Sequence, residues 1–324
     1  MTGVAVVSRH DAVVTRHKHI SPTTVLIAST LLIFCSFSLL IRMPYMRNAG
    51  DWDILIFTQR WPNTVCMTWE EKSPGHTCRL PQSPHLWTIH GIWPSKLGQI
   101  GPQFCNKSAV YNESTVEDLR LTLDEYWADI EGTGDERFWE HEWLKHGTCA
   151  MTDRLLRTER SYFEQGLAWN KQYNVNDMLN AAQVRPGDNN QAYNVTVIAD
   201  AIQTATGKAP RIQCIHDVKT GLPFLFEVRI CFDKNLTLTD CFGTRASDTW
   251  MYTAGSTHRW RGGGGMEVKE SAKVVTNCPM DKPIMYPGSV PSPHRRRALF
   301  EDDQPQFFLV RFYKTLKLLI WATL

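Results

Sequence analysis

Four side chains that can move protons or stabilise negative charge lie within six residues of the sequence: His141, Glu142, Lys145 and His146. If this segment forms an α-helix, each residue advances by about 100°, so the four side chains fall within an arc of about 140° on one face. A neutral imidazole can accept a proton, a protonated imidazole can donate one, and an ammonium group stabilises developing negative charge. The segment is therefore a candidate site for acid and base catalysis.

A zinc site and a merely solvated helix face are the alternatives for this segment. Zinc proteases place two histidines four residues apart on a helix, whereas His141 and His146 are five apart and about 140° from each other, which is poor geometry for one shared ion. A solvated pairing of Glu142 with Lys145 or His146 at helical spacing would need no function. The flanking residues argue against that alternative because they supply an apolar surface that would be buried against a core: Trp139, Trp143 and Leu144.

A second segment, Trp87 to Pro94, places another histidine near the end of an expected strand. Its Thr, Ile and Trp residues favour a strand and the stretch from Gly91 breaks it, so His90 is expected where a buried strand emerges into a loop. A lone histidine there is most often a satisfied core residue. Two histidines from two segments, with a glutamate and a lysine beside one of them, instead meet the needs of proton transfer at a phosphate.

The segments Trp87 to Pro94 and Phe138 to Cys149 resemble the two active-site segments of the ribonuclease T2 family, the transferase-type acid ribonucleases. The similarity extends from about Asp51 to Pro287 and includes the strand-like opening Ile54 to Pro62 and the half-cystines. The resemblance implies an endoribonuclease that cleaves single-stranded RNA without a metal or other cofactor. Its products would be a 2′,3′-cyclic phosphate and then, more slowly, a 3′-phosphate.

The resemblance also implies a role for each residue of the two segments. His90 and His146 would be the acid and base pair, His141 would bind the phosphate, and Glu142 with Lys145 would stabilise the pentacoordinate state. Which of the two histidines removes the 2′ proton is left open by the sequence.

Two aromatic residues match base-stacking positions of the family. Trp93 follows His90 by three residues, and Phe138 precedes the catalytic group on the same expected helix. Core packing is the alternative for both, and Trp87 is expected to be structural. Ser95 stands where some relatives have an acidic residue, so the base preference is expected to be broad.

The elements that must position these residues are interspersed strands and helices without strict βαβ alternation. This order indicates an α+β fold with a mainly antiparallel central sheet and several flanking helices, which is also the fold of the family. The stretch 63–84 has no periodicity and is expected to be irregular. Strands are expected at 52–61, 211–216, 224–232 and 236–241, and helices at 114–130, 161–173, 175–182 and 195–206.

Cysteines and glycosylation sequons indicate an oxidising, glycosylating lumen. Eight cysteines follow residue 41, and Cys35 lies in an apolar segment and is expected to be unpaired. Spacing alone does not fix the pairing, but the resemblance implies four disulfides: Cys66 with Cys78, Cys105 with Cys149, Cys214 with Cys278, and Cys231 with Cys241. The expected glycosylation sites are Asn106, Asn112, Asn194 and Asn235.

The ends of the chain differ in composition from the rest. Residues 25–41 form an apolar run at the lower limit for a membrane span, which is expected to be either a cleaved signal peptide or a signal anchor after a cytosolic or n-region tail at 1–24. The catalytic domain is expected at 50–288. Residues 289–324 read as a linker and an amphipathic extension, so membrane association is expected through either 25–41 or this tail. The extension could equally be a tail peculiar to this chain.

The net charge of +2 argues against broad binding of duplex nucleic acid, so RNA must be met locally. We expect a monomer in the secretory pathway, secreted or held in the lysosomal or endosomal lumen, or anchored there as a type II membrane protein. A glycoprotein that acts by binding a receptor or glycan, with incidental nuclease activity, is the alternative. The intact set at 90, 141, 142, 145 and 146 favours the enzyme.

Overall fold

The computed structural model describes residues 49–73, 75–83, 85–97, 101–188, 191–241, 251–252 and 274–292. All of them belong to one compact unit, Arg47–Leu324. The segments 1–24 and 25–41, and the tail beyond residue 292, lie outside the described residues. In the part of the chain that is described, no helix has both the length and the apolar character needed to cross a membrane.

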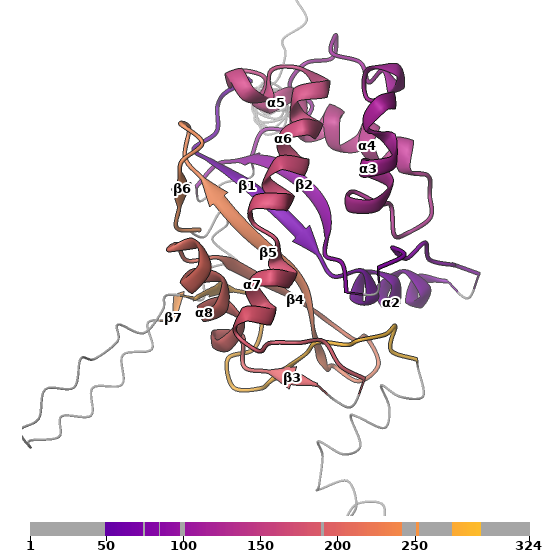
Figure 1. Ribbon diagram of the computed structural model, residues 1–324, viewed down its shortest axis with the longest axis vertical. Coiled ribbons are helices and arrows are strands. Elements are labelled where there is room, and N and C mark those ends of the chain that lie inside the picture. Colours follow the sequence, from indigo (N-terminus) through magenta and orange to yellow (C-terminus); the bar gives the residue numbers. More distant parts are fainter. Residues whose placement is uncertain are drawn as a thin grey trace, which may run out of the picture. The chain divides into compact units, whose positions relative to one another are not determined.

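A twisted sheet forms the centre of the fold (Figure 1), with the strand order β2-β1-β5-β4-β8-β7. Neighbouring strands are antiparallel except for the pairs β4 with β8 and β5 with β9, so the predicted mainly antiparallel sheet is confirmed. The strands are β1 (Ile54–Arg60), β2 (Thr88–Ser95), β3 (Ala192–Tyr193), β4 (Arg211–His216), β5 (Pro223–Phe232), β6 (Leu238–Thr239), β7 (Met251–Tyr252), β8 (Val274–Thr276) and β9 (Ile284–Met285).

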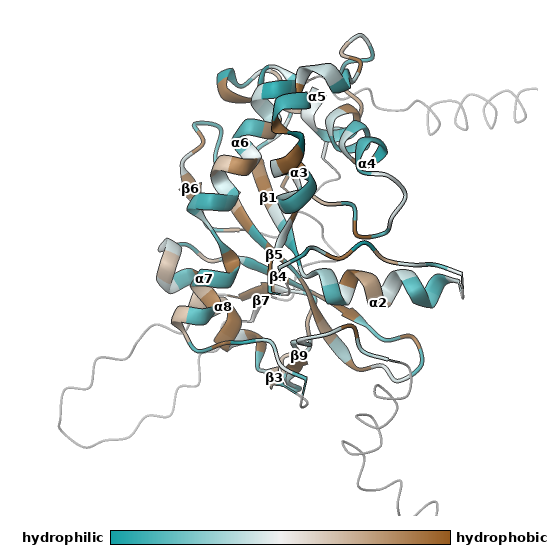
Figure 2. Cartoon of the chain, turned by 45° about the vertical axis from the view of Figure 1, so that its right-hand side comes forward, coloured by the Kyte–Doolittle hydropathy of each residue, from teal (hydrophilic) through white to brown (hydrophobic). Residues whose placement is uncertain are grey.

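Helices flank the sheet, and their surfaces mix hydrophilic and hydrophobic residues (Figure 2), as expected when one side of a helix is buried. The longer helices are α2 (Pro62–Lys72), α3 (Arg120–Tyr126), α4 (Asp135–Glu142), α6 (Glu159–Gln172), α7 (Val175–Ala181) and α8 (Val195–Thr206). A π-helical turn, η3 (Trp143–Gly147), and a short helix, α5 (Thr148–Ala150), continue α4. Single turns of 3₁₀-helix are η1 (Glu113–Thr115), η2 (Glu117–Leu119) and η4 (Arg154–Leu156).

Helices α6, α7 and α8 confirm three of the expected helices, and α8 ends at Gly207, whose φ of 71° is left-handed. Two expectations about helices are wrong. The stretch after Pro62 was expected to be irregular but forms α2, because proline is well tolerated in the first turn of a helix. The single helix expected from residue 114 is broken into η1, η2 and α3, and Asn112 rather than Ser114 caps its start.

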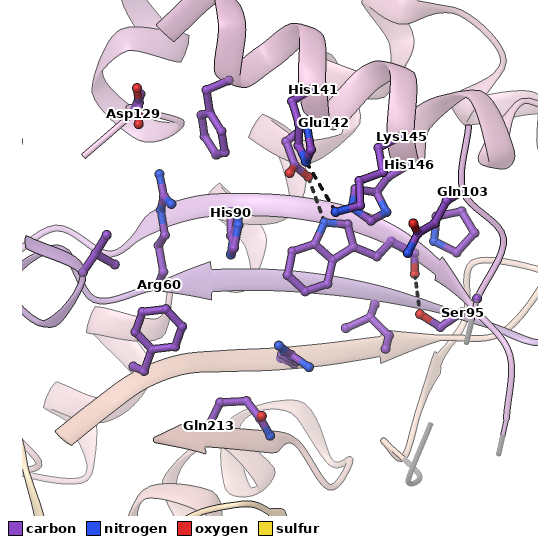
Figure 3. Close-up of a pocket in the computed structure, with 18 of the residues that line it drawn as sticks. Arg60, His90, Ser95, Gln103, Asp129, His141, Glu142, Lys145, His146 and Gln213 are labelled. Carbon is purple, nitrogen blue, oxygen red and sulfur yellow. Dashed lines mark hydrogen bonds between the residues drawn. The ribbon is translucent and has the colours of Figure 1, made fainter. Parts of the chain in front are cut away.

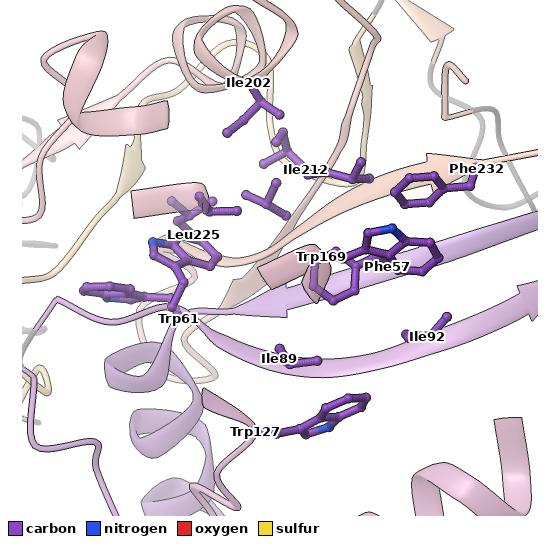
Figure 4. Close-up of a cluster of buried hydrophobic side chains, with 14 of the residues drawn as sticks. Phe57, Trp61, Ile89, Ile92, Trp127, Trp169, Ile202, Ile212, Leu225 and Phe232 are labelled. Carbon is purple, nitrogen blue, oxygen red and sulfur yellow. The ribbon is translucent and has the colours of Figure 1, made fainter. Parts of the chain in front are cut away.

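The sheet separates a hydrophobic core from the face that carries the polar cavity. All seven residues of β1 are buried, so both faces of this central strand are covered. On the core face, Phe57 packs 5.8 Å from Trp169 of α6, and Trp169 stacks on Phe232 of β5 at 4.1 Å between ring centroids (Figure 4). Successive side chains of a strand point to opposite faces of the sheet, so Ile56 and Arg60 of β1 face the cavity.

Two bulges interrupt the pairing of the central strands close to the cavity. In β2, Thr58 pairs with Gly91 and Gln59 pairs with Ile89, which leaves His90 as the extra residue. In β5, Gln213 pairs with Glu227 and Cys214 with Leu225, which leaves Phe226 as the extra residue. Bulges turn side chains away from the regular alternation, so each of them changes the direction of a residue at the site.

Four disulfides hold the segments between these elements, and their pairing is the one that the family resemblance implies. They are Cys66–Cys78, Cys105–Cys149, Cys214–Cys278 and Cys231–Cys241. The bond between Cys105 and Cys149 joins the segment after β2 to the short helix that follows the π-helical turn.

Candidate active site

A cavity of about 680 Å³ lies between the α4–η3 segment and the face of the sheet opposite the core. Figure 3 shows His141, Glu142, Lys145 and His146 on the helical side and His90 on the strand opposite. The cavity is lined by every residue to which a catalytic or base-binding role was assigned, namely His90, Trp93, Phe138, His141, Glu142, Lys145 and His146, and also by Ser95. The structure therefore brings the two sequence segments together.

The helical side is not the regular α-helix that the sequence suggested. It changes to a π-helical turn at Trp143, and the backbone N–H of Thr148 bonds to the carbonyl of Trp143, five residues earlier. The angles of about 100° per residue therefore hold for His141 and Glu142 only. His141 is exposed and its Nε2 lies 3.4 Å from the Lys145 Nζ, whereas Glu142 is buried.

His146 lies among aromatic and cationic groups. Its ring is 5.4 Å from that of Trp93 and 6.5 Å from that of His141. Burial, followed by the positive charges of Lys145, His90 and His141, lowers the pKa of His146 well below its ordinary value. These surroundings therefore favour the neutral form of His146.

His90 has a carboxylate partner that the sequence motifs did not reveal. Its Nδ1 lies 2.6 Å from Oε1 of Glu227, a residue of β5 that is 137 positions away in the sequence. Burial lowers the pKa of His90 and Glu227 raises it, with a lowered value as the net result. The two histidines thus have different surroundings: His90 is bonded to an anion, and His146 is beside cations.

Glu142 is a buried carboxyl group held by an indole. Trp93 Nε1 donates a hydrogen bond to Glu142 Oε2 at 2.8 Å. Burial raises the pKa of Glu142 to about 8, although the Trp93 hydrogen bond and the Arg60 charge oppose the rise. Only glycine fits beside this pair, because a Cβ on Gly91 would lie 2.0 Å from Glu142 Oε2. Glu142 therefore lines the cavity as a neutral carboxylic acid near pH 7.

Glu227 has the opposite charge state. Burial favours its neutral form, but Arg229 and His90 outweigh that effect and lower the pKa of Glu227 to about 2. Arg229 donates from Nη2 at 2.6 Å and from Nε at 3.0 Å to Glu227 Oε2. Two carboxyl groups with pKa values pushed apart in one site are typical of acid and base chemistry.

Arg60 closes the far end of the cavity beside Phe138. Its Nη2 donates to the carbonyl of Ala128 at 2.9 Å, and its guanidinium carbon lies 4.6 Å from the centre of the Phe138 ring. Sequence reasoning missed Arg60, Glu227 and Arg229. The available signal was a charged residue inside a strand that is otherwise apolar, because such charges are rarely buried without a partner.

The aromatic residues assigned to base stacking are partly occupied by protein contacts. The Trp93 ring has His90 at 4.8 Å in an edge contact and the Arg229 guanidinium at 5.1 Å. Phe138 is half-buried and its ring is 6.0 Å from that of His90. Trp87 is 1% exposed and donates to the Tyr286 hydroxyl, in agreement with the structural role expected for it.

One cluster among the described residues has the spacing of a metal site, Cys66 with Glu70 and Cys78, and its two cysteines form a disulfide. A disulfide offers no thiolate to a metal. This cluster is also separate from the histidines of the cavity, so the zinc alternative gains no support from it.

Comparison with known proteins places the site in a family. Residues 52–241 match the ribonuclease T2 family. Mouse ribonuclease T2-A is 31% identical over 260 residues, which cover 78% of this chain and 88% of the mouse protein. Zebrafish ribonuclease T2 is 31% identical over 224 residues, covering 67% of this chain and 86% of the zebrafish protein.

Solved structures agree with this match. RNase NT in complex with 5′-AMP has a TM-score of 0.51 at 33% identity and covers 59% of this chain and 91% of its own. Ribonuclease MC1 from the seeds of bitter gourd has a TM-score of 0.51 at 26% identity and covers 59% of this chain and 95% of its own. The matched region contains both histidine-bearing segments and the strand that carries Glu227, and the chain belongs to the ribonuclease T2 family.

Proposed function

We propose that the protein is an endoribonuclease that cleaves single-stranded RNA by attack of the 2′-oxygen on its own phosphate. The observation that carries the proposal is the pairing of His90 and His146 across one cavity, with a neutral carboxyl group and a lysine beside them. Only RNA offers a 2′-hydroxyl next to the scissile phosphate. The relatives named above are ribonucleases.

In this mechanism His146 is the base and His90 is the acid. The lowered pKa of His146 keeps it neutral and able to take the 2′ proton. The contact with Glu227 favours a proton on His90, which His90 gives to the 5′-oxygen as the bond between that oxygen and phosphorus breaks. The product carries a 2′,3′-cyclic phosphate. Water then opens it to a 3′-phosphate, with the two histidines exchanging their roles.

Glu142, Lys145 and His141 stabilise the phosphate in the transition state. As a neutral acid, Glu142 donates a hydrogen bond to a non-bridging oxygen instead of repelling it. Lys145 adds positive charge, and the exposed His141 beside it contacts the phosphate as it enters. Donors placed where charge develops are among the largest contributions to catalysis.

Bases are held by stacking next to the phosphate site. Trp93 and Phe138 offer ring surfaces at the two ends of the catalytic group, and Arg60 lies against Phe138. Stacking on an aromatic side chain contributes about 1 to 3 kcal/mol per base and does not depend strongly on base identity. Ser95 bonds to the Trp93 carbonyl and adds no charge, so a broad base preference is expected.

Incubation of the protein with single-stranded RNA and EDTA tests this function, because the mechanism uses neither a metal nor another cofactor. We expect full activity in EDTA and products that end in cyclic phosphate, visible by mass spectrometry. Complete loss of cleavage that zinc restores would contradict the histidine pair, and cleavage of DNA at the same rate would contradict the 2′-oxygen as nucleophile.

The secretory location fits the four disulfides, since such bonds persist in oxidising compartments. One of the similar proteins is the extracellular ribonuclease LE of tomato. Asn112, Asn194 and Asn235 are exposed and Asn106 is half-buried, so we propose glycans at the first three above all. Sequencing the N-terminus of the mature protein distinguishes a cleaved signal from a membrane anchor at 25–41.

We propose that the enzyme acts as a monomer, because one chain by itself supplies every residue to which the mechanism assigns a role. Membrane association through 25–41 or the tail beyond 292 concerns segments outside the described residues. The receptor- or glycan-binding alternative does not account for a neutral glutamate and two histidines of different charge preference in one cavity, so the ribonuclease is the function that we propose.

A further inference from the structure

We propose that Glu227 and Arg229 form a positioning pair, in which Glu227 fixes the ring of the proton donor His90 and Arg229 fixes both Glu227 and Trp93. This inference rests on the proposed function, because it takes His90 as the group that protonates the leaving oxygen. It adds two residues from a strand outside both sequence motifs.

The contact requires a reach across the sheet. His90 is on β2 and Glu227 is on β5, and β1 lies between these strands. Neighbouring strands are about 4.8 Å apart, so His90 must turn along the sheet surface to come within 2.6 Å of Glu227. In β1, Thr58 lies between the two strands at this level, paired with Gly91 on one side and Arg229 on the other.

Both ends of the contact lie at irregular places in the strands. His90 is the extra residue of the bulge in β2, and Glu227 follows Phe226, the extra residue of the bulge in β5. A bulge weakens the local pairing, so two of them at this level of the sheet have a cost. That cost is understandable if the bulges bring the imidazole and the carboxylate together.

The charges of the pair are arranged so that each carboxylate oxygen has its own partner. Oε1 of Glu227 faces His90, and Oε2 accepts two hydrogen bonds from Arg229. Glu227 is 2% exposed, and a buried carboxylate is costly unless its charge is paired. An apolar residue at this position would satisfy the fold at lower cost, which points to a role in the reaction.

The contact determines which nitrogen of His90 meets the substrate. A proton on Nδ1 points to Glu227, so Nε2 is the nitrogen that is free to face the cavity. When Nε2 gives its proton to the 5′-oxygen, the bond between that oxygen and phosphorus breaks and His90 becomes neutral with its remaining proton on Nδ1. Glu227 stays ionised throughout because its pKa is about 2.

Arg229 extends the pair to the other carboxyl group of the site. Its guanidinium lies 5.1 Å from the centre of the Trp93 ring, and Trp93 donates its indole hydrogen to Glu142. Loss of Arg229 would therefore loosen Glu227 and Trp93 together. Lysine is a poor replacement because it lacks the planar fork that bonds a carboxylate through two nitrogens.

The groups that face His90 determine how the pair affects its ionisation. Glu227 from β5 is the anion among them, whereas Arg60 from β1, Arg229 from β5 and His146 from η3 carry or can carry positive charge. Glu142 is neutral below about pH 8. Removal of the Glu227 charge therefore lowers the pKa of His90, and the alkaline limb of the activity profile moves to lower pH.

Two substrates separate a role in protonating the leaving oxygen from a merely structural one. RNA has a poor alkoxide leaving group that needs the acid, whereas a nucleoside 3′-(4-nitrophenyl phosphate) has a leaving group that departs without a proton. For Glu227→Gln we expect kcat on RNA to fall about 10- to 100-fold, the range known for groups that orient metal-binding histidines. On the nitrophenyl ester we expect a change of less than about threefold.

Further variants complete the test in the full chain. Glu227→Asp keeps the charge, so we expect a smaller loss and an alkaline limb close to that of the wild type. Arg229→Lys should lose activity on both substrates, because the contact with Trp93 is weakened and Trp93 in turn holds Glu142 by a hydrogen bond. Glu159→Gln is the matched control: Glu159 is 7% exposed, accepts from the Asn112 backbone and does not line the cavity, so its kinetics should match the wild type.

Equal losses of Glu227→Gln on the two substrates, or an unchanged alkaline limb, would overturn the positioning role. If Glu227→Gln does not fold, Glu227→Asp decides, because a loss on RNA that spares the nitrophenyl ester supports the pair and an equal loss refutes it. Failure of the proposed function is a different result, in which the wild type itself does not cleave RNA or His90→Ala cleaves it at the normal rate.

Discussion

Two buried glutamates give the site its division of charge. Among the described residues, no cation forms a hydrogen bond with Glu142, so burial dominates and raises its pKa to about 8. Glu227 is bonded to Arg229 and His90, and these contacts lower its pKa to about 2 despite similar burial. In the proposed mechanism, the same residue type therefore supplies a neutral hydrogen-bond donor to the phosphate and an anion to the proton donor.

Replacing either His90 or His146 with alanine should lower kcat on RNA by about 10² to 10⁴, the range for positioned acid and base groups. The measurement is steady-state cleavage of a short single-stranded RNA. His76→Ala is a suitable control, because His76 stacks on Trp69 and does not line the cavity. Near-normal turnover of either active-site variant would show that the pair is wrongly identified.

The pH profile should be bell-shaped with an acidic optimum. The rate rises as His146 loses its proton, at a pKa well below 6.5, and falls as His90 loses its own, at a pKa that is also below 6.5. A second loss follows near pH 8 as Glu142 ionises and repels the phosphate. In Glu142→Gln this second loss should be absent. A profile that is flat from about pH 4 to 9 would contradict the mechanism.

Irregularities in the secondary structure bring the side chains to the cavity. The π-helical turn shifts Lys145 and His146 relative to a continuous α-helix, and the bulge in β2 turns His90. Irregularities of both kinds are frequent at functional sites. The segment after β2 is tied to the π-helical turn, because Phe104 N–H donates to the Lys145 carbonyl at 3.0 Å and Cys105 bonds to Cys149.

Removing the disulfide with Cys105→Ser and Cys149→Ser should reduce activity at temperatures where the protein is still folded. The bond restrains the end of the helical segment that carries His141 and His146, and its loss should lower the free energy of unfolding by about 2 to 4 kcal/mol. RNA cleavage and thermal melting are measured together.

The control pair is Cys214→Ser with Cys278→Ser, which removes a bond that joins β4 to the segment after β8. It should destabilise the fold comparably and leave activity at low temperature nearly unchanged. Wild-type activity and melting temperature without the Cys105–Cys149 bond would rule out its bracing role.

At the scale of the whole molecule, the sheet has one face for stability and one for chemistry. Helices α6 and α8 and the strands bury the aromatic and aliphatic core on one side. The other side carries arginines and the proposed proton donor: Arg60, His90, Arg211 and Arg229 line the cavity. Groups that act in catalysis must be held in place by packed elements, and a sheet with a packed core on one face provides such support for the charged groups on the other.

A polypeptide of residues 49–292 should fold and cleave RNA like the full chain, because it contains all the described residues that form the core and the cavity. The measurements are melting temperature and kcat/KM in an oxidising buffer. The full chain serves as the control. Loss of folding in the shorter polypeptide would show that one of the terminal segments contributes to the domain.

Local sequence determined which residues could do the chemistry. His141, Glu142, Lys145 and His146 are close in the chain, so any helical conformation keeps them together, and His90 is identified by the segment that surrounds it. Runs of β-branched and aromatic residues were sufficient for the central strands, and helical periodicity was sufficient for helices α6, α7 and α8, because burial of one helix face leaves a periodic pattern.

The tertiary structure alone decided the contacts between distant strands. Glu227 meets His90 across 137 residues, and that contact depends on strand order and on two bulges, neither of which leaves a periodic signal in the sequence. The π-helical turn likewise depends on tertiary packing. A π-helical turn is less stable than a regular α-helical turn, and contacts with residues distant in sequence offset that difference. The charge states of Glu142 and Glu227 follow from their burial and their hydrogen-bond partners. Both residues are glutamates, so the sequence gives no sign that one is neutral and the other ionised.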